Sequence, residues 1–364
     1  MSQDAPLRID AKELFSSQVE EYLEVQTAMQ RGVEEVAPQS LFVRVVYSSW
    51  FYLAICAGFG GFCGWAILEP FLDDNELQKL QQGGRPAAAD LIAGMLLFPT
   101  VAGFVGLFLG AAEGIMCRNA RRAVISGVVG LGVGFGGGLV ALIPTGMLFN
   151  VMQAIAAGFV KNPMQAQPTG LALLILMMGR GAAWALVSIP AGLGQGIALK
   201  EKKVAFNGVL GGVLGGLLGG LLFDPISFVF VTADGQAAAS RAIGLSIVGV
   251  MVGLFVGLVE GWTKTAWLLM RKGPLAGKQF VLFKDTTILG SSPKAEIYLF
   301  KDDAIEPRHA IIHNRGGRFE IEDCETPDGT YINGIPIKKQ VLKSGDQIVM
   351  GKTVLEFSVR EAKG

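Results

Sequence analysis

The sequence predicts a chain of two fold classes, an α-helical polytopic membrane domain followed by an all-β sandwich. Three observations carry this prediction. Hydrophobic residues make up 51% of the chain and charged residues only 17%, and there are 50 glycines. Soluble domains carry about 25% charged residues and about 7% glycine. From residue 278 onward, short segments alternate apolar and polar residues, as strands do. We therefore expect four parts: residues 1–44, 45–270, 271–277 and 278–364.

Residues 1–44 are predicted to form an acidic amphipathic helix on the cytoplasmic side of the membrane. Apolar residues recur with helical spacing in Ala11–Val36, and acidic residues cover the other faces of this helix. An anionic membrane surface would repel such a helix. Two interpretations stay open: the helix packs on protein, either a partner or this chain, or it is solvated and has no specific partner.

Residues 45–270 contain the segments that are long and apolar enough to cross a bilayer, which takes about 20 residues. The six segments are Val46–Leu68, Leu91–Met116, Ala123–Ile143, Gly181–Leu199, Val204–Phe223 and Ala242–Glu260. Residues 146–178 are also apolar, but in pieces that are short for a span. These pieces are interfacial, re-entrant, or outer extensions of the neighbouring helices, so seven or eight spans remain alternatives to six.

Internal repeats favour six spans arranged as three helical hairpins. The segment "GLFLGAAEG" (106–114) recurs as "GLFVGLVEG" (253–261), with a weaker copy, "AGLGQG" (191–196). The segment "GGFCGWAILEP" (60–70) resembles "GGLLGGLLFDP" (215–225). We expect these hairpins to contact lipid along their lengths.

The basic residues of the short loops predict the orientation of the hairpins in the membrane. They concentrate at one set of helix ends: Arg44, Arg118, Arg121, Arg122, Lys200, Lys202, Lys203, Lys264, Arg271 and Lys272. Basic loops stay in the cytoplasm. We therefore expect a multi-pass protein of the cell inner (cytoplasmic) membrane with both termini in the cytoplasm. At the opposite ends, Arg180 and Arg241 are expected to extend to the membrane interface.

Glycines recur every four residues in one segment, with a second row beside the first: Gly208, Gly212, Gly216 and Gly220, then Gly211, Gly215 and Gly219. Lipid gives helices no hydrophobic reason to associate, so small residues that permit close backbone contact mark helix interfaces. We expect tight packing inside the hairpin bundle. A homo-oligomer formed through the glycine-rich helices and a glycine-lined pore are the alternatives.

Two glutamates, Glu113 and Glu260, occupy equivalent positions at the cytoplasmic ends of two repeats. Arg118 and Lys264 follow them by five and four residues, and a Glu-to-Lys pair at i,i+4 is an ordinary helix ion pair. The alternative is that these carboxylates couple ion or proton movement to transport. Functional charges of that kind lie deep in the membrane, and no charged residue continues such a path at mid-span, so we favour the pairing interpretation.

The C-terminal part carries five motifs that resemble, in order and at suitable spacing, the forkhead-associated (FHA) domain. They are "ILG" (288–290), "EIYL" (296–299), "RHAII" (308–312), "DGTYING" (328–334) and "LKSGDQIVMG" (342–351). The resemblance covers about the last quarter of the chain. It implies an antiparallel sandwich whose loops at one end bind phosphothreonine peptides. The membrane part resembles, more loosely, the glycine-rich repeat regions of bacterial proteins that carry this module.

The loops that the resemblance assigns to peptide binding depart from the family pattern in three places. Ser291 replaces an arginine, Glu306 replaces the phosphate-contacting serine, and Asp328 replaces an asparagine. The expected peptide-binding face comprises Ser291, Glu306, Arg308, Thr326, Asp328 and Asn333, and the residues kept for structure are Gly290, His309, Gly329 and Gly334. A phosphate group carries close to two negative charges. Like charges in contact cost several kcal/mol, so we expect a fold that is kept and a phosphate pocket that is lost.

These features predict a membrane-anchored scaffold whose FHA-like module recruits a cytoplasmic protein partner independently of phosphate. The two alternatives are a transporter or channel regulated by the module, and a phosphothreonine-dependent signalling receptor. The chain has only two histidines and no nucleotide-binding loop after a strand, so we expect no enzyme, no cofactor and no metal site. Its net charge of zero gives no argument for nucleic acid.

Overall fold

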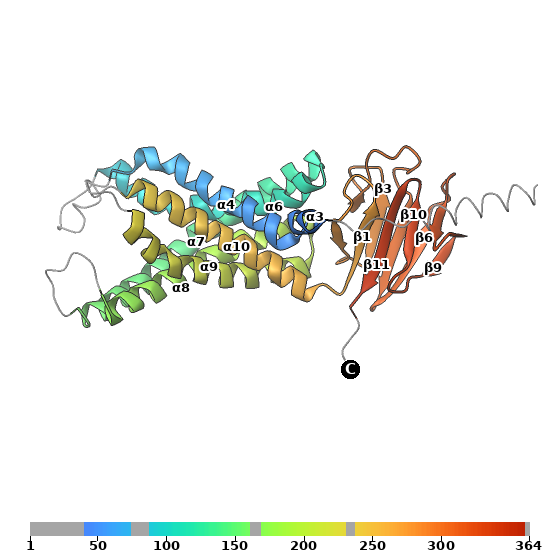
Figure 1. Cartoon of the computed structure of the whole chain (residues 1–364). Coiled ribbons are helices and arrows are strands. Elements are labelled where there is room, and N and C mark those ends of the chain that lie inside the picture. Colours follow the sequence, from blue (N-terminus) through green and yellow to red (C-terminus); the bar gives the residue numbers. More distant parts are fainter. Residues whose placement is uncertain (1–39, 74–86, 161–168, 231–236, 361–364) are drawn as a thin grey trace, which may run out of the picture. The chain divides into compact units, whose positions relative to one another are not determined.

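The computed structural model describes residues 40–73, 87–160, 169–230 and 237–360 (Figure 1). The chain divides into two compact units, a helical unit, Leu41–Lys264, and a β unit that begins at Thr265. Most of the predicted acidic helix, residues 1–39, lies outside the described residues. The short helix α3, Leu41–Val46, opens the described part of the helical unit.

Six helices of the described residues are long and apolar enough to cross a membrane, which confirms the predicted helical architecture. A single 3-10 turn, η1 (Glu69–Phe71), follows the first of them. The six are α4 (Ser49–Leu68), α6 (Ala88–Met116), α7 (Ala120–Ala157), α8 (Leu171–Leu199), α9 (Lys202–Phe230) and α10 (Ala238–Thr263). Residues 146–157 prolong α7 and residues 171–178 begin α8. The ambiguous apolar pieces are therefore outer extensions of neighbouring helices, within the described residues.

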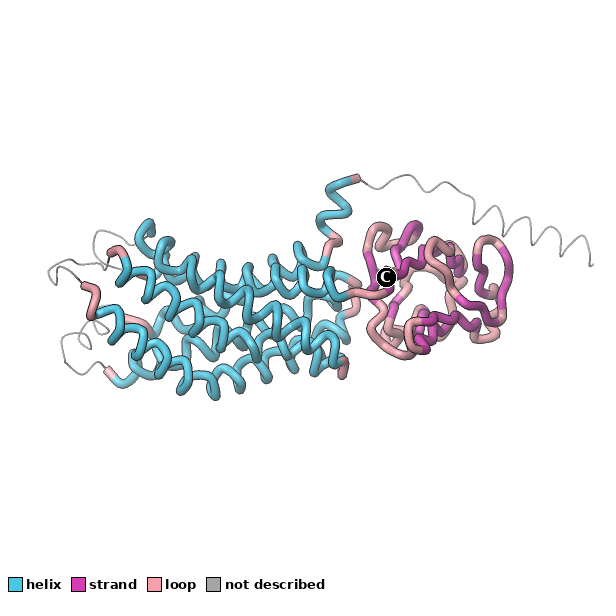
Figure 2. Tube along the Cα trace, turned by 90° about the horizontal axis from the view of Figure 1, so that it is seen from below, coloured by secondary structure: helices cyan, strands magenta, loops and turns pink. Residues whose placement is uncertain are grey.

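Each helix packs on the next and α10 packs on α4, so the helices form a closed ring. Figure 2 shows them lying side by side along the bundle. The helices α6 and α8 also contact each other. The interior is filled by apolar side chains of α4, α6, α8 and α10, among them Leu53, Leu109, Trp184, Leu245 and Val252. This packed centre is the reason the bundle holds together without a hydrophobic driving force from lipid.

The glycine rows of α9 face its two neighbours in the ring. A Cβ at Gly208 would lie 2.1 Å from the carbonyl oxygen of Gly192 on α8. A Cβ at Gly215 would lie 2.4 Å from the carbonyl oxygen of Met251 on α10. Real Cβ atoms do not approach this closely, so the rows bring backbones together, as predicted. Since both rows are covered by this chain's own helices, they offer no free face for a second copy.

Close backbone contacts of this kind occur at three places around the ring. They join Gly106 of α6 to Gly130 of α7, and Gly192 of α8 to Gly208 of α9. Between α10 and α4, a Cβ at Gly253 would lie 2.2 Å from the carbonyl oxygen of Leu53. The repeats seen in the sequence thus appear as three equivalent contacts, the third of which closes the ring.

The β unit is a sandwich of two sheets, which confirms the predicted all-β class. One sheet has the strand order β2-β1-β11-β10-β7-β8 and the other β4-β3-β5-β6-β9. The bounds of the strands in the first sheet are β1 (Ala266–Lys272), β2 (Gln279–Val281), β7 (Thr330–Ile332), β8 (Ile335–Ile337), β10 (Gln347–Met350) and β11 (Thr353–Val359). In the second they are β3 (Thr286–Gly290), β4 (Ile297–Tyr298), β5 (Ala310–Arg315), β6 (Arg318–Asp323) and β9 (Lys339–Val341).

The boundary between the two units lies earlier than the sequence predicts. We expected the membrane domain to reach residue 270 and a linker over 271–277, but α10 ends at Thr263 and β1 begins at Ala266. Strand β1 pairs with β11 on one side and β2 on the other. Because a strand buried in a sheet is apolar, "AWLLM" resembles the continuation of a membrane span.

Candidate peptide-binding loops

Two loops of the sandwich are tied together at the place where β3 ends. The backbone N–H of Ser291 donates to the carbonyl oxygen of Glu306, at 2.9 Å. A Cβ at Gly290 would lie 2.3 Å from the carbonyl oxygen of Pro307, so only glycine fits at this position. The first and second loops expected from the family resemblance are therefore held side by side.

His309 joins the second loop to the third. Its ring is fully buried. Nδ1 accepts from the backbone N–H of Glu306 at 3.2 Å, so the ring hydrogen is on Nε2. Nε2 lies 3.1 Å from the carbonyl oxygen of Gly329 and 3.3 Å from Oγ1 of Thr326. Both ring nitrogens are engaged by these contacts.

Asp323, which the sequence analysis did not single out, shapes the third loop. Its Oδ2 accepts from the backbone N–H of Thr326 at 3.1 Å. Its Oδ1 accepts from the hydroxyl of Thr326 at 3.0 Å and from the hydroxyl of Thr330 at 2.6 Å. An aspartate three residues before a threonine is a turn signal that could have identified it. The hydroxyl hydrogen of Thr326 is thereby already donated within the loop.

Asn333 is also engaged inside the sandwich. Its Nδ2 donates to Oδ1 of Asp346 at 2.9 Å, and its Oδ1 accepts from the backbone N–H of Gln347 at 2.9 Å. Asn333 and Gly334 both have positive φ, at 50° and 83°, as the tight turn between β7 and β8 requires. The side-chain amide therefore fixes this turn against the loop before β10, at the opposite end of β7 from Thr330, so the structure does not bring Asn333 together with the other predicted residues.

The charged side chains at this end are exposed and carry both signs, with Lys294 on the loop that begins at Ser291. Glu306, Arg308 and Asp328 are exposed, and so is Glu325, which has a positive φ of 58°. None of the described residues forms an ion pair with Glu306, Arg308 or Asp328. Arg308 lies beside Cys324: burial raises the pKa of the Cys324 thiol, while the Arg308 guanidinium acts in the opposite direction.

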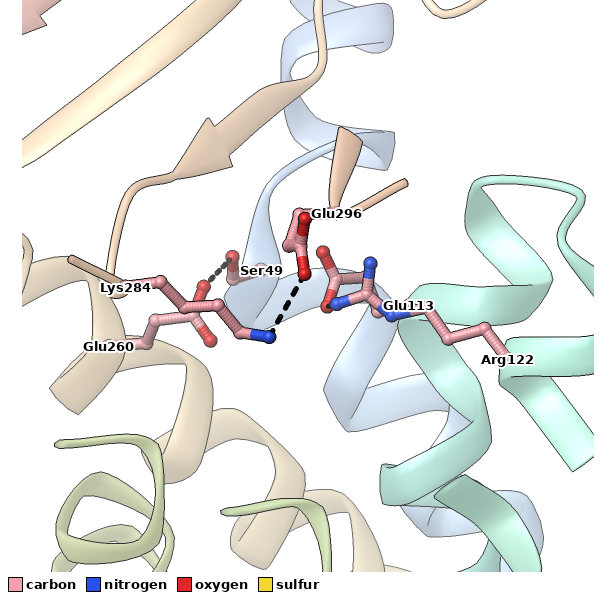
Figure 3. A network of polar contacts seen from close by, with 6 residues as sticks. All are labelled: Ser49, Glu113, Arg122, Glu260, Lys284 and Glu296. Atoms are coloured by element: carbon pink, nitrogen blue, oxygen red, sulfur yellow. Dashed lines mark hydrogen bonds and ion pairs between the residues drawn. The ribbon is translucent and has the colours of Figure 1, made fainter. Parts of the chain in front are cut away.

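The two membrane glutamates have partners on neighbouring helices. Arg122 Nη2 of α7 donates to Glu113 Oε2 at 3.0 Å, and Ser49 Oγ of α4 donates to Glu260 Oε1 at 2.9 Å (Figure 3). Figure 3 also shows the ion pair between Lys284 and Glu296 of the β unit, at 3.2 Å. The glutamates thus join adjacent helices of the ring.

The opposite end of the bundle holds two ion pairs that the sequence analysis missed. Arg241 Nε and Nη2 donate to the two carboxylate oxygens of Glu69, at 3.0 and 2.6 Å. Arg180 Nε lies 3.0 Å from Oδ1 of Asp224. The arginines expected to extend to the membrane interface are therefore paired. The available sequence signal for these pairs was the acid–proline pair that closes two of the repeats, Glu69-Pro70 and Asp224-Pro225.

Comparison with known proteins agrees with the geometry of the β unit. The FHA domain family model matches residues 287–351. The oxoglutarate dehydrogenase inhibitor of Corynebacterium jeikeium is 39% identical over 101 residues, 28% of this chain and 67% of that protein. The glycogen accumulation regulator GarA of Mycolicibacterium smegmatis is 38% identical over 100 residues, 27% of this chain and 63% of that protein. Both names describe regulatory proteins rather than enzymes.

A solved FHA domain of a Chlamydia trachomatis protein aligns with 27% of this chain and 100% of its own, at 25% identity and a TM-score of 0.25. This chain spans about two thirds of the length of the curated relatives, and they match only its C-terminal part. The family match, the curated relatives and the two-sheet sandwich agree: the chain belongs to the FHA-domain proteins, with its FHA domain at the C-terminus.

Proposed function

We propose that this chain is a membrane-anchored docking protein whose FHA domain binds a cytoplasmic protein partner without requiring a phosphate. Six apolar helices supply the anchor. Basic residues gather in the short loops after α6 and α8, as the cytoplasmic ends of spans do. An even number of spans then leaves the FHA domain in the cytoplasm.

The exposed carboxylate of Glu306 carries the proposal. The backbone of Glu306 is fixed on both sides, because its N–H donates to His309 Nδ1 and its carbonyl oxygen accepts from Ser291. The side chain is exposed at the position where FHA domains present a hydroxyl to phosphate. A carboxylate held there opposes a phosphate, since like charges in contact cost several kcal/mol.

The donors that could compensate are few. Ser291 supplies a neutral hydroxyl where the family has an arginine, which would bind phosphate with two hydrogen bonds. The Thr326 hydroxyl donates to Asp323, and the Asn333 amide donates to Asp346. Arg308 and Lys294 remain, both exposed on loops that also carry the exposed carboxylates of Glu306 and Asp328.

The exposed acidic side chains favour a basic partner segment. Glu306, Glu325 and Asp328 are all exposed on the loops of this end. Lysine or arginine in a partner would find complementary charge there, which raises the association rate and disfavours anionic competitors. We infer that the partner presents a basic segment to these loops.

A peptide array on the full-length protein in detergent micelles tests the proposal. Each threonine-containing peptide is present in phosphorylated and unphosphorylated form, and basic and acidic sets are included. We expect no preference for phosphate and stronger binding of basic peptides. A phosphothreonine peptide that binds about tenfold tighter than its unphosphorylated form would support a phosphate-dependent receptor instead.

A reversion variant sharpens the test. Ser291→Arg, Glu306→Ser and Asp328→Asn together restore the family residues, and we expect this variant to gain a preference for phosphothreonine peptides. A reversion that gains none would show that these three residues do not determine phosphate recognition.

A matched control adds the same three positive charges at the other end of the sandwich. It combines Asp285→Asn, Thr286→Lys and Ser344→Arg. These positions lie near the β5–β6 turn, because Thr286 pairs with His313 and the backbone N–H of Leu342 donates to the carbonyl oxygen of Phe319. We expect the control to bind like the wild type. If the control gained the same preference as the reversion, net charge alone would explain the gain.

A further inference from the structure

A cavity of about 370 Å³ lies among α6, α7 and α8, near the ends of these helices that are remote from the basic short loops. Its wall is mostly apolar and includes the aromatic rings of Phe98, Phe149 and Trp184. Three polar side chains also line it: Asp90, Thr145 and Arg180. Small-molecule sites have this character, an apolar concavity with a few placed polar groups.

Two of these polar groups are buried and lack the partners that burial demands. Thr145 is 6% exposed, and its Oγ1 has no hydrogen-bond partner among the described residues. Asp90 is 8% exposed, and the only hydrogen bond between the described residues and its carboxylate comes from the backbone N–H of Asp73, 2.8 Å from Oδ1. Burying such groups costs free energy unless a hydrogen bond or counter-charge offsets the loss of water.

Arg180 does not supply the counter-charge for Asp90. Its Nε lies 3.0 Å from Asp224 Oδ1, and its guanidinium carbon lies 5.4 Å from the ring centroid of Phe149 and 5.1 Å from that of Phe223. The charge of Arg180 is therefore balanced by Asp224. Among the described residues that line the cavity, the carboxylate of Asp90 is then the one charge without a counter-charge.

The aromatic wall suits a cation as well. The rings of Phe98 and Trp184 are in contact, with centroids 4.9 Å apart. Aromatic faces attract cations through their quadrupoles, most strongly for tryptophan. A negative charge, an unused hydroxyl and an aromatic pair are thus gathered on one apolar wall.

We propose that this cavity binds a small amphiphilic cation, with an ammonium head at Asp90 and Thr145 and an apolar or aromatic body against Phe98 and Trp184. An ammonium group donates three hydrogen bonds, which satisfies both the carboxylate and the threonine hydroxyl. A carboxylate ligand would be repelled by Asp90, and a neutral ligand would leave its charge uncompensated. The site belongs to the helical unit and stands apart from the docking role of the FHA domain.

Titration calorimetry of the full-length protein in detergent micelles tests this proposal. The probe is phenethylammonium, with phenethyl alcohol as its neutral counterpart and phenylpropionate as an anion of similar size. We expect saturable binding of the ammonium, at least about tenfold tighter than that of the other two. Binding of the alcohol or the anion with equal affinity, or no saturable binding of the ammonium at millimolar concentration, overturns the proposal.

Three variants locate the probe. Asp90→Asn keeps the size of the side chain and is expected to weaken ammonium binding about tenfold. Gly146→Leu fills the cavity from α7, where an added Cβ meets nothing within 4 Å, and is expected to abolish binding. Glu201→Gln, in the short loop between α8 and α9, is the control and should bind as the wild type does.

Circular dichroism and thermal melting establish that each variant is folded. If Asp90→Asn does not fold, Gly146→Leu decides the question, because its folding does not depend on the carboxylate. Ammonium binding that survives in Gly146→Leu, or in a folded Asp90→Asn, refutes the assignment of the site.

Discussion

Replacing Gly192 by alanine should part the helices α8 and α9. The added Cβ would lie 2.0 Å from the carbonyl oxygen of Gly208, whereas carbon and oxygen in close contact across helices are about 3.3–3.6 Å apart. The two backbones must therefore separate by about 1.3 Å at this point. A gap of about 1 Å already loses a quarter to a half of the dispersion energy of the atoms that face it.

The expected net effect is a loss of roughly 1–2 kcal/mol in the free energy of unfolding. Overpacking of a tight interface costs about 1–3 kcal/mol. The better helix propensity of alanine returns up to about 1 kcal/mol. Denaturant unfolding of the full-length protein in detergent micelles, followed by far-UV circular dichroism, measures the difference.

Gly132→Ala in α7 is the matched control, because an added Cβ there meets nothing within 4 Å. It should leave stability unchanged or raise it by up to about 1 kcal/mol. The double variant Gly192→Ala/Gly208→Ala should lose less than the sum of its single variants, since one separation relieves both clashes. Equal effects of Gly192→Ala and Gly132→Ala would refute the close-contact argument.

Three further predictions concern single contacts. Glu69→Gln should lower the free energy of unfolding by about 2–4 kcal/mol, because Arg241 is left partly buried beside a neutral group. Changing both residues to leucine should recover much of that loss, and an equal loss in the double variant would contradict this explanation. Asp323→Asn should cost the FHA domain about 1–3 kcal/mol, seen as a lower melting temperature of its β-sheet signal, since two hydroxyls lose an anionic acceptor; an unchanged melt would argue against that role. Arg308→Met should slow alkylation of Cys324 by iodoacetamide at pH 8. The guanidinium lowers the pKa of the Cys324 thiol, so its removal raises that pKa further and reduces the fraction of thiolate. Mass spectrometry of the Cys324 peptide measures the rate. A faster reaction would place Arg308 away from the thiol.

The helical architecture could be predicted because apolar length and internal repeats are local properties of the sequence. The residues at which the helices end were harder to predict from the sequence. Pro144 and Pro225 coincide with the ends that the sequence predicts, yet α7 and α9 continue beyond them to Ala157 and Phe230. Membrane helices tolerate proline, because neighbouring groups satisfy the freed backbone atoms.

Pairing between distant residues was the part that the sequence could not supply. Arg241 meets Glu69 only because α10 returns to α4, and no spacing along the chain reveals that closure. The predicted boundary of the β unit was wrong for a related reason. Trp267–Leu269 is as apolar as a membrane span, and only its pairing with β11 identifies it as a strand. In the loops, the substitutions at Ser291, Glu306 and Asp328 were visible, but the binding role of this face remains a prediction.

The hydrogen bond between Ser49 and Glu260 joins the first long helix of the bundle to the last. In a ring of helices closed in this way, the packing does not depend on which helix comes first in the chain. The segment that enters α4 and the one that leaves α10 therefore meet at one point on the circumference. A permuted gene that links these two ends and opens the chain between α7 and α8 should still encode the same bundle, because such rearrangements succeed where natural ends are neighbours.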